Sequence, residues 1–118
     1  MTPVLHQGLT VERWRVFPWD QRILHMVSEL NRAAHWIRKG DEGLADDSIE
    51  RVLELVDLSI EAGFSQKPVS FLKEFLRWRE LLAGFYKNTA AMPYREFRTL
   101  LKALIDLDPS VHNLELKI

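Results

Sequence analysis

The residues that first suggest chemistry are two copies of the tripeptide Arg-Trp-Arg, centred on Trp14 and on Trp78. An aromatic ring between two guanidinium groups is a pattern that stacks on bases and holds phosphates in nucleic-acid-binding proteins. Both copies lie in segments with the helical period, where residues two apart point about 200° apart. The two arginines of one copy therefore cannot hold one ligand together. We interpret Trp14, Trp78 and also Trp36 as structural anchors.

A second candidate is a cluster of charged residues on helical stripes. Arg79 falls on a mostly apolar line, so its guanidinium group needs an acidic partner. Asp57 belongs to a line of acidic residues in the segment before it and is the first candidate for that partner. Charges that converge inside a bundle mark a polar pocket, which is where we would first look for a site. The alternative is that the acidic line is a solvated face. The candidate intra-bundle cluster consists of Glu29, Arg32, Asp57 and Arg79.

Metal and catalytic chemistry find little support in the residue pattern. His25 has Glu29 four residues later, but one such pair is too small for a metal site. The Glu-x-x-His motif of di-iron bundles is absent. The sequence has no cysteine, no Gly-rich phosphate loop and no serine in a nucleophile elbow. We therefore expect no catalytic residue, no metal site and no cofactor.

Chain length and net charge limit the class of protein further. The chain has 118 residues, which fits one domain, and a formal net charge of −1. Nucleic-acid-binding domains usually carry a basic excess, so this balance makes nucleic acid an unlikely partner unless a basic patch is local. The N-terminus lacks the pattern of a secretory signal, and no stretch has the apolar length of a membrane span. A cytoplasmic location is therefore expected.

Helical periodicity, caps and breakers predict the elements that must position these residues. Thr10 precedes a short first helix, Asp20 is the predicted N-cap of a long second one, and Gly40 ends it. The stretch "GDEGLADD" is predicted as a turn, and Asp47 as the cap of the third helix. The fourth helix begins at Pro68 or Ser70 and lasts to about Lys87. The predicted helices cover residues 11–17, 20–39, 48–62, 68–87 and 94–107.

No strand pattern and no internal repeat is present, so the predicted fold is all-α. We expect a single-domain antiparallel four-helix bundle with a short extra N-terminal helix. The domain covers residues 1–118, with a lead-in at 1–19, the bundle at 20–107 and a tail at 108–118. The tail fits either a last helical turn or an extended piece.

Three segments, "SELNRAAHWIRKGD", "SIERVLELVDLSI" and "LKEFLRWRELLAGFY", together resemble a family of small uncharacterised helical proteins from prokaryotes. The likeness covers about residues 21–87 and implies a compact helical bundle without an assigned activity. It includes Trp36 and all four residues of the candidate cluster. A weaker likeness, in pattern and hairpin length, connects the chain with the flagellar export chaperone bundle. That likeness implies an apolar groove that takes up a partner helix.

The function expected from these features is a non-enzymatic interaction, adaptor or chaperone-like module that binds a protein partner or itself. The reason is a surplus of large apolar residues, including four Trp and six Phe, which would form an exposed patch. The alternative is that the N-terminal lead-in and the tail cover these residues. The alternative function is that of an RNA- or nucleotide-associated domain of a toxin–antitoxin type system. A basic groove containing Arg13, Arg15, Arg95 and Arg98 would favour nucleic acid, and an apolar groove would favour a protein partner.

Overall fold

The computed structural model describes residues 10–64, 67–91 and 93–111. Within these ranges every regular element is an α-helix, which confirms the predicted all-α class. None of the described helices is long and apolar enough to cross a membrane. The helices are α1 (Val11–Arg15), α2 (Trp19–Lys39), α3 (Glu42–Ala62), α4 (Val69–Phe85) and α5 (Tyr94–Leu107).

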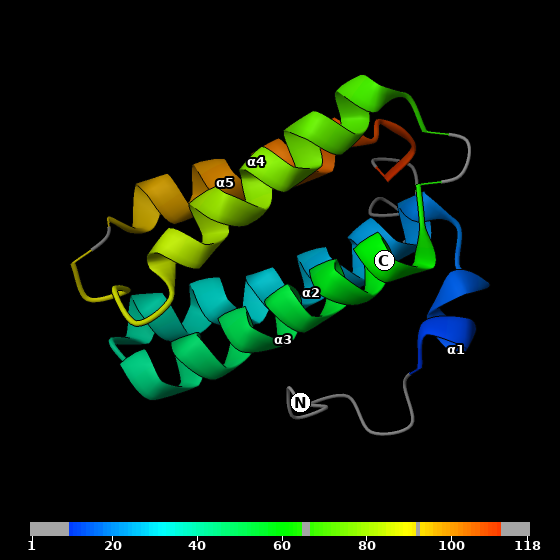
Figure 1. The fold of residues 1–118 in the computed structure, drawn as a ribbon. Helices are drawn as coiled ribbons and strands as arrows, with labels where there is room; N and C mark the ends of the chain where they lie inside the picture. Colours follow the sequence, from blue (N-terminus) through cyan, green and yellow to red (C-terminus); the bar gives the residue numbers. More distant parts are fainter. Residues whose placement is uncertain (1–9, 65–66, 92, 112–118) are drawn as a thin grey trace.

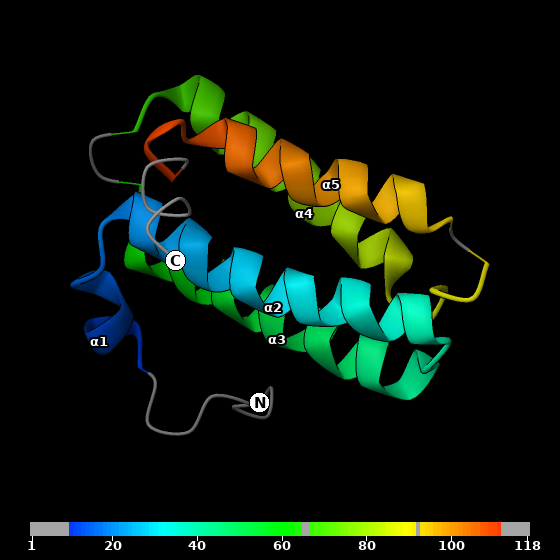
Figure 2. The ribbon, with the colours of Figure 1, turned by 180° about the vertical axis from the view of Figure 1, so that it is seen from behind.

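The four long helices form two pairs that lie one above the other (Figures 1 and 2). Helices α2 and α3 make one pair, and α4 and α5 make the other. Helix α2 also packs against α5, while α3 and α4 have the fewest contacts among these neighbouring pairs. The short helix α1 lies at the end of the molecule where α2 begins, and it packs against α3.

The ends of α2 show how its terminal residues are used. The helix begins at Trp19, one residue before the predicted start, and Pro18 is its N-cap. Asp20 was predicted as that cap, but its carboxylate instead accepts a hydrogen bond from the backbone N–H of Gln21. The predicted stop is confirmed, because Gly40 has φ 77°, a left-handed conformation that glycine adopts without steric cost.

Helix α3 begins earlier than predicted, so most of "GDEGLADD" is helical rather than a turn. Asp41 is the N-cap, and its carboxylate accepts a hydrogen bond from Leu44 N at 3.0 Å. Ala45 is fully buried, so the added turn contributes to the core. Asp47 lies inside the helix instead of capping it. Both aspartates suit a cap, and burial of Ala45 favours the longer helix.

Helix α4 ends at Phe85, and Lys87 follows in a left-handed conformation with φ 62°. The bounds of α5 agree with the prediction, with Pro93 just before its first turn. In the predicted tail, Asp108–Val111 close a helical turn in which Val111 is buried. Residues 112–118 lie outside the described part of the chain.

The tryptophans differ in how deeply they are buried and in what their indole groups bind. Trp14 and Trp78 are 2 % and 3 % exposed, as expected of anchors, while Trp36 is half-buried. The Trp14 indole donates to Ser59 Oγ at 2.7 Å, and the Trp78 indole donates to Leu100 O at 2.8 Å. A buried indole gains stability from such a bond in addition to its buried area.

Candidate binding surfaces

The four charged residues of the predicted cluster form two separate ion pairs. Arg79 binds Asp57 with both ends of its guanidinium group, Nε to Oδ1 at 2.9 Å and Nη2 to Oδ2 at 3.3 Å. Arg32 pairs instead with Glu29 on its own helix at 3.4 Å. The side chains of Arg79 and Asp57 are 34 % and 57 % exposed. The expectation of one cluster inside the bundle is therefore wrong, because the pair between α3 and α4 lies at the surface.

Further polar contacts follow the same seam between α3 and α4, toward the C-terminal end of α4. The Tyr86 hydroxyl donates to Glu50 Oε1 at 2.5 Å, and the backbone N–H of Lys87 donates to Asp46 Oδ1 at 2.9 Å. The hydrogen bond to Glu50 raises the pKa of Tyr86 to about 12, with smaller effects of burial and of nearby carboxylates. We call this surface the α3–α4 face, and its contacts run antiparallel along the two helices.

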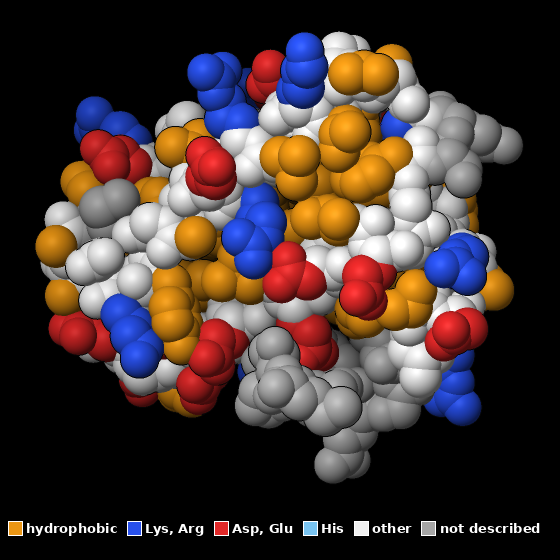
Figure 3. All heavy atoms as spheres, in the orientation of Figure 1, with side chains coloured by type: hydrophobic (Ala, Val, Ile, Leu, Met, Phe, Trp, Pro, Cys, Tyr) orange, Lys and Arg blue, Asp and Glu red, His pale blue; other side chains and the backbone are white. Residues whose placement is uncertain are grey.

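The other half of the α3–α4 face is apolar. The same antiparallel register brings Leu72 and Leu76 of α4 opposite Ile60 of α3 and Phe64, just beyond its end. The Phe64 ring lies 6.1 Å from the Phe75 ring, which supports this register. Leu76 is 40 % exposed, although it lies on the side of α4 that faces α3. Figure 3 shows hydrophobic side chains gathered here, over the N-terminal half of α4. We call these four residues the apolar half of the face.

The most unusual buried group in the described chain is the guanidinium of Arg22, which is 5 % exposed. Its Nε donates to Phe17 O at 2.9 Å and its Nη2 to Arg15 O at 3.3 Å. Its Nη1 donates to Gly63 O at 3.1 Å and to Ser59 O at 3.5 Å. Burial lowers the pKa of Arg22, and the nearby charge of Arg15 lowers it further. The side chain thus ties the end of α1 to the end of α3 through backbone carbonyl groups alone.

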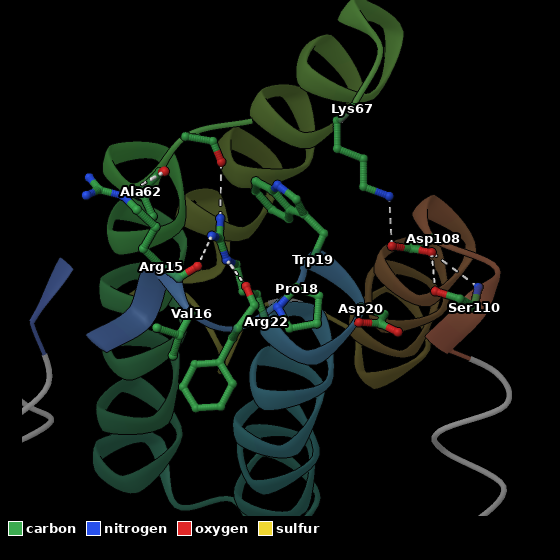
Figure 4. A pocket seen from close by; sticks show the side chains of 12 residues that line it. Arg15, Val16, Pro18, Trp19, Asp20, Arg22, Ala62, Lys67, Asp108 and Ser110 are labelled. Atoms are coloured by element: carbon green, nitrogen blue, oxygen red, sulfur yellow. Dashed lines mark hydrogen bonds and ion pairs between the residues drawn. The ribbon is translucent and has the colours of Figure 1, made fainter. Parts of the chain in front are cut away.

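A hollow lies beside Arg22, between the start of α2 and the turn after α5 (Figure 4). Lys67 Nζ binds Asp108 Oδ2 at 2.9 Å there, and Ser110 donates to the other oxygen of the same carboxylate. Burial alone would raise the pKa of Asp108, but the bonds from Ser110 and Lys67 lower it. Because Arg22 and Lys67 are already engaged, we interpret this hollow as a structural junction rather than a ligand site.

The sequence also carries a signal for Arg22. Arg22 lies three residues after Trp19 and four before Met26, both of them buried. It therefore falls on an apolar helical line, which is the same criterion that singled out Arg79. A sequence pattern cannot show that the partners of Arg22 are carbonyl groups, because every residue has one in its backbone.

Comparison with known proteins does not add a relative. No family model matches the chain, and neither a curated protein nor a solved structure matches it. Within the described ranges, no group of three or more His, Asp or Glu side chains is placed to hold a metal ion. Any functional conclusion therefore depends on the surfaces of the molecule itself.

Proposed function

We propose that this protein is a non-catalytic interaction module that binds an amphipathic helix of a partner protein on the apolar half of the α3–α4 face. The observation that carries the proposal is the exposure of large apolar side chains on α4, with Val69 66 % exposed and Leu76 40 % exposed. Exposed apolar area where two helices meet is typical of a surface that takes up a third helix.

The charges at the edge of this surface suggest the chemistry of the partner helix. Glu61 borders the apolar half on α3 and is exposed, whereas Asp57, four residues earlier, already binds Arg79. A partner with apolar residues three and four apart, and with basic residues on the side toward α3, complements this edge. Self-association is the competing possibility, in which a second copy covers the same surface.

Three sequence expectations remain part of this proposal. The arrangement as an antiparallel four-helix bundle suits a face between two helices that admits a further helix. The resemblance to small helical proteins implies no activity of its own. A cytoplasmic location would give the module access to cytoplasmic partners.

Two exposed leucines of α4 provide a matched test. Leu76 lies on the proposed surface, while Leu81, 57 % exposed, points about 140° away around the helix. We expect Leu76→Glu to abolish capture of specific host proteins by the tagged chain, and Leu81→Glu to leave capture unchanged. Thermal unfolding of both variants checks that neither change disturbs the fold.

The alternatives give different results in the same experiment. Equal capture by the wild type and Leu76→Glu would overturn the proposed surface, and so would equal loss in both variants. Light scattering tests whether a second copy of the chain covers this surface. A dimer that Leu76→Glu converts to a monomer would identify the occupant as another copy of this chain and overturn the assignment to a different protein.

A further inference from the structure

The opposite side of the molecule carries a groove between α2 and α5 that is lined by cations. One hollow there is lined by His35, Arg38 and Lys39 of α2, with Tyr94 of α5. A second hollow follows along α5, and Asn31 and Arg98 line both hollows, so the two form one groove. Helices α2 and α5 lie side by side in the view of Figure 2. We call this feature the basic groove; its cations are Arg38, Lys39, Arg95, Arg98 and Lys102.

The cations of the basic groove have little compensation from the protein itself. No Asp or Glu lines either hollow. Within the described ranges, Arg38, Lys39, Arg95 and Arg98 form no ion pair, whereas Lys102 lies 3.7 Å from Asp106 with both side chains exposed. Elsewhere, Arg79 and Lys67 each bind a carboxylate at 2.9 Å. The groove thus keeps its positive charge available for an external anion.

The positions of these cations on α5 are unfavourable for the isolated helix. Arg95 lies in the first turn, at the positive end of the helix dipole, where acidic residues are preferred. Arg98 follows three residues later and Lys102 another four, so like charges neighbour one another along one side. A bound anion would offset both effects. Anion binding therefore explains these cation positions, whereas the stability of the helix does not.

The spacing fits a chain of phosphates. Arg95 and Lys102 are seven residues apart, which corresponds to about 10 Å along a helix. Three cations spread over this length can contact successive phosphates of one nucleic-acid strand, which carries one negative charge per phosphate. Arginine forks bind phosphate oxygens with two hydrogen bonds. Asn31 and Thr99 line the same groove and supply neutral polar groups of the kind that contact phosphate and sugar.

The distribution of charge and apolar groups favours nucleic acid over a membrane surface. Helices that bind membranes insert large apolar side chains, but none of those exposed in the described chain belongs to α2 or α5. The net charge of −1 does not oppose this inference, because the acidic residues concentrate on α3. These are Glu42, Asp46, Asp47, Glu50, Glu54, Asp57 and Glu61.

We propose that the basic groove binds the phosphate backbone of a nucleic-acid strand without reading its bases. The site is distinct from the apolar half of the α3–α4 face and does not depend on the function proposed for it. Of the residues that the sequence suggested for a nucleic-acid groove, Arg95 and Arg98 belong to it. Arg13 and Arg15 do not line it, since they lie on α1, which packs against α3.

The test measures fluorescence anisotropy of labelled oligo(U) and oligo(dT) of about twelve nucleotides with the full chain. Three phosphate contacts, one for each cation of the row on α5, predict a log–log salt slope of about −2 for a single strand. The double variant Arg95→Gln/Arg98→Gln should weaken binding more than about tenfold and reduce the steepness of the slope by about 1.4. Comparing the two oligomers shows whether the ribose or deoxyribose strand is preferred.

The matched control is Arg32→Gln/Arg77→Gln, which removes two exposed arginines that do not line the groove. It lowers the net charge equally, and we expect binding within about twofold of the wild type. Equal loss in both double variants, or no binding by the wild type at low salt, would overturn the proposal. So would equally tight, equally variant-sensitive binding of polyglutamate or of phosphatidylserine vesicles, which would assign the groove to an acidic protein or a membrane.

Discussion

Arg22 and Arg79 both fall on apolar lines of long helices, yet the structure accommodates them in opposite ways. Arg22 is buried and donates to four backbone carbonyl groups at 2.9–3.5 Å. Arg79 remains partly exposed and binds the carboxylate of Asp57, which is more exposed still. An arginine on an apolar line thus indicates a polar connection between elements, but it does not by itself indicate an acidic partner.

The difference lies in what each arrangement must desolvate. A buried ion pair takes two charges out of water, and this cost often exceeds the attraction gained. The Arg22 junction desolvates one charge and places it against carbonyl groups at the C-terminal ends of α1 and α3, where helix dipoles favour a cation. The Asp57–Arg79 pair avoids most of the cost by staying in contact with water, and its contribution to stability is correspondingly small.

The strongest test of this contrast is Arg22→Met, which keeps an unbranched apolar stem and removes the donors. Because several carbonyl groups lose a charged partner at once, we expect the free energy of unfolding to fall by about 3 kcal/mol or more. Urea unfolding measures the change. Arg15→Met, which removes an exposed arginine of the same region, serves as the control and should cost much less. A loss below about 1 kcal/mol for Arg22→Met would show that the junction is not a major source of stability.

Ser59 sharpens the comparison, because it belongs to the junction and also accepts the Trp14 indole N–H. Ser59→Ala leaves that buried donor without its acceptor, so we expect a loss of about 1–3 kcal/mol in chemical denaturation. Ser28 provides the control, since its hydroxyl makes the same bond to the carbonyl four residues earlier but is exposed. Equal effects of Ser59→Ala and Ser28→Ala would contradict a role for the Trp14 bond.

For the exposed pair the expected effect is smaller. Asp57→Ala should lower the free energy of unfolding by no more than about 1 kcal/mol, because solvent and salt screen the interaction. A double-mutant cycle with Arg79→Ala isolates the coupling and should show it weaken at high salt. A coupling of several kcal/mol would mean that the pair behaves as a buried one and would remove the contrast with Arg22.

The smallest effect concerns Tyr86, which lies on the same seam as Arg79. Its pKa is raised to about 12 from 10.0, so the folded state favours the protonated hydroxyl. The resulting stabilisation is fully present below pH 10 and is lost as the pH rises toward 12. Tyr86→Phe should therefore flatten this part of the alkaline stability curve. An unchanged slope between wild type and variant would show that the bond to Glu50 does not persist in solution.

Sequence patterns predicted what depends on residue type and period. Apolar spacing and caps predict the helical class, the bounds of α5 and the stop at Gly40. They also predict the anchoring roles of Trp14 and Trp78. The pattern also named Asp57 as a partner for Arg79, and the structure brings the two together. The predicted start of α3 was wrong because Asp41 and Asp47 both suit a cap, and the burial of Ala45 favours the earlier one.

What the patterns did not predict depends on distances between helices. The Asp57–Arg79 pair is exposed because α3 and α4 make limited contact with each other. Residue types do not reveal how closely two helices pack. The basic groove joins Arg38 to Arg98 across sixty residues of sequence, so it exists only once α2 and α5 are adjacent. A balanced net charge concealed it, because the acidic residues gather on a different helix.

The Arg22 junction has a consequence for how the native state opens. Helix α1 has five residues, too few to persist alone, and its last carbonyl is held by a side chain of α2 that also holds α3. When α1 detaches, Arg22 loses its hydrogen bond to Arg15 O, and its buried charge keeps fewer partners. Fraying of α1 and loosening of the packing between the start of α2 and the end of α3 are therefore coupled. Amide hydrogens of α1 and of the last turn of α3 should exchange with the solvent as one cooperative unit.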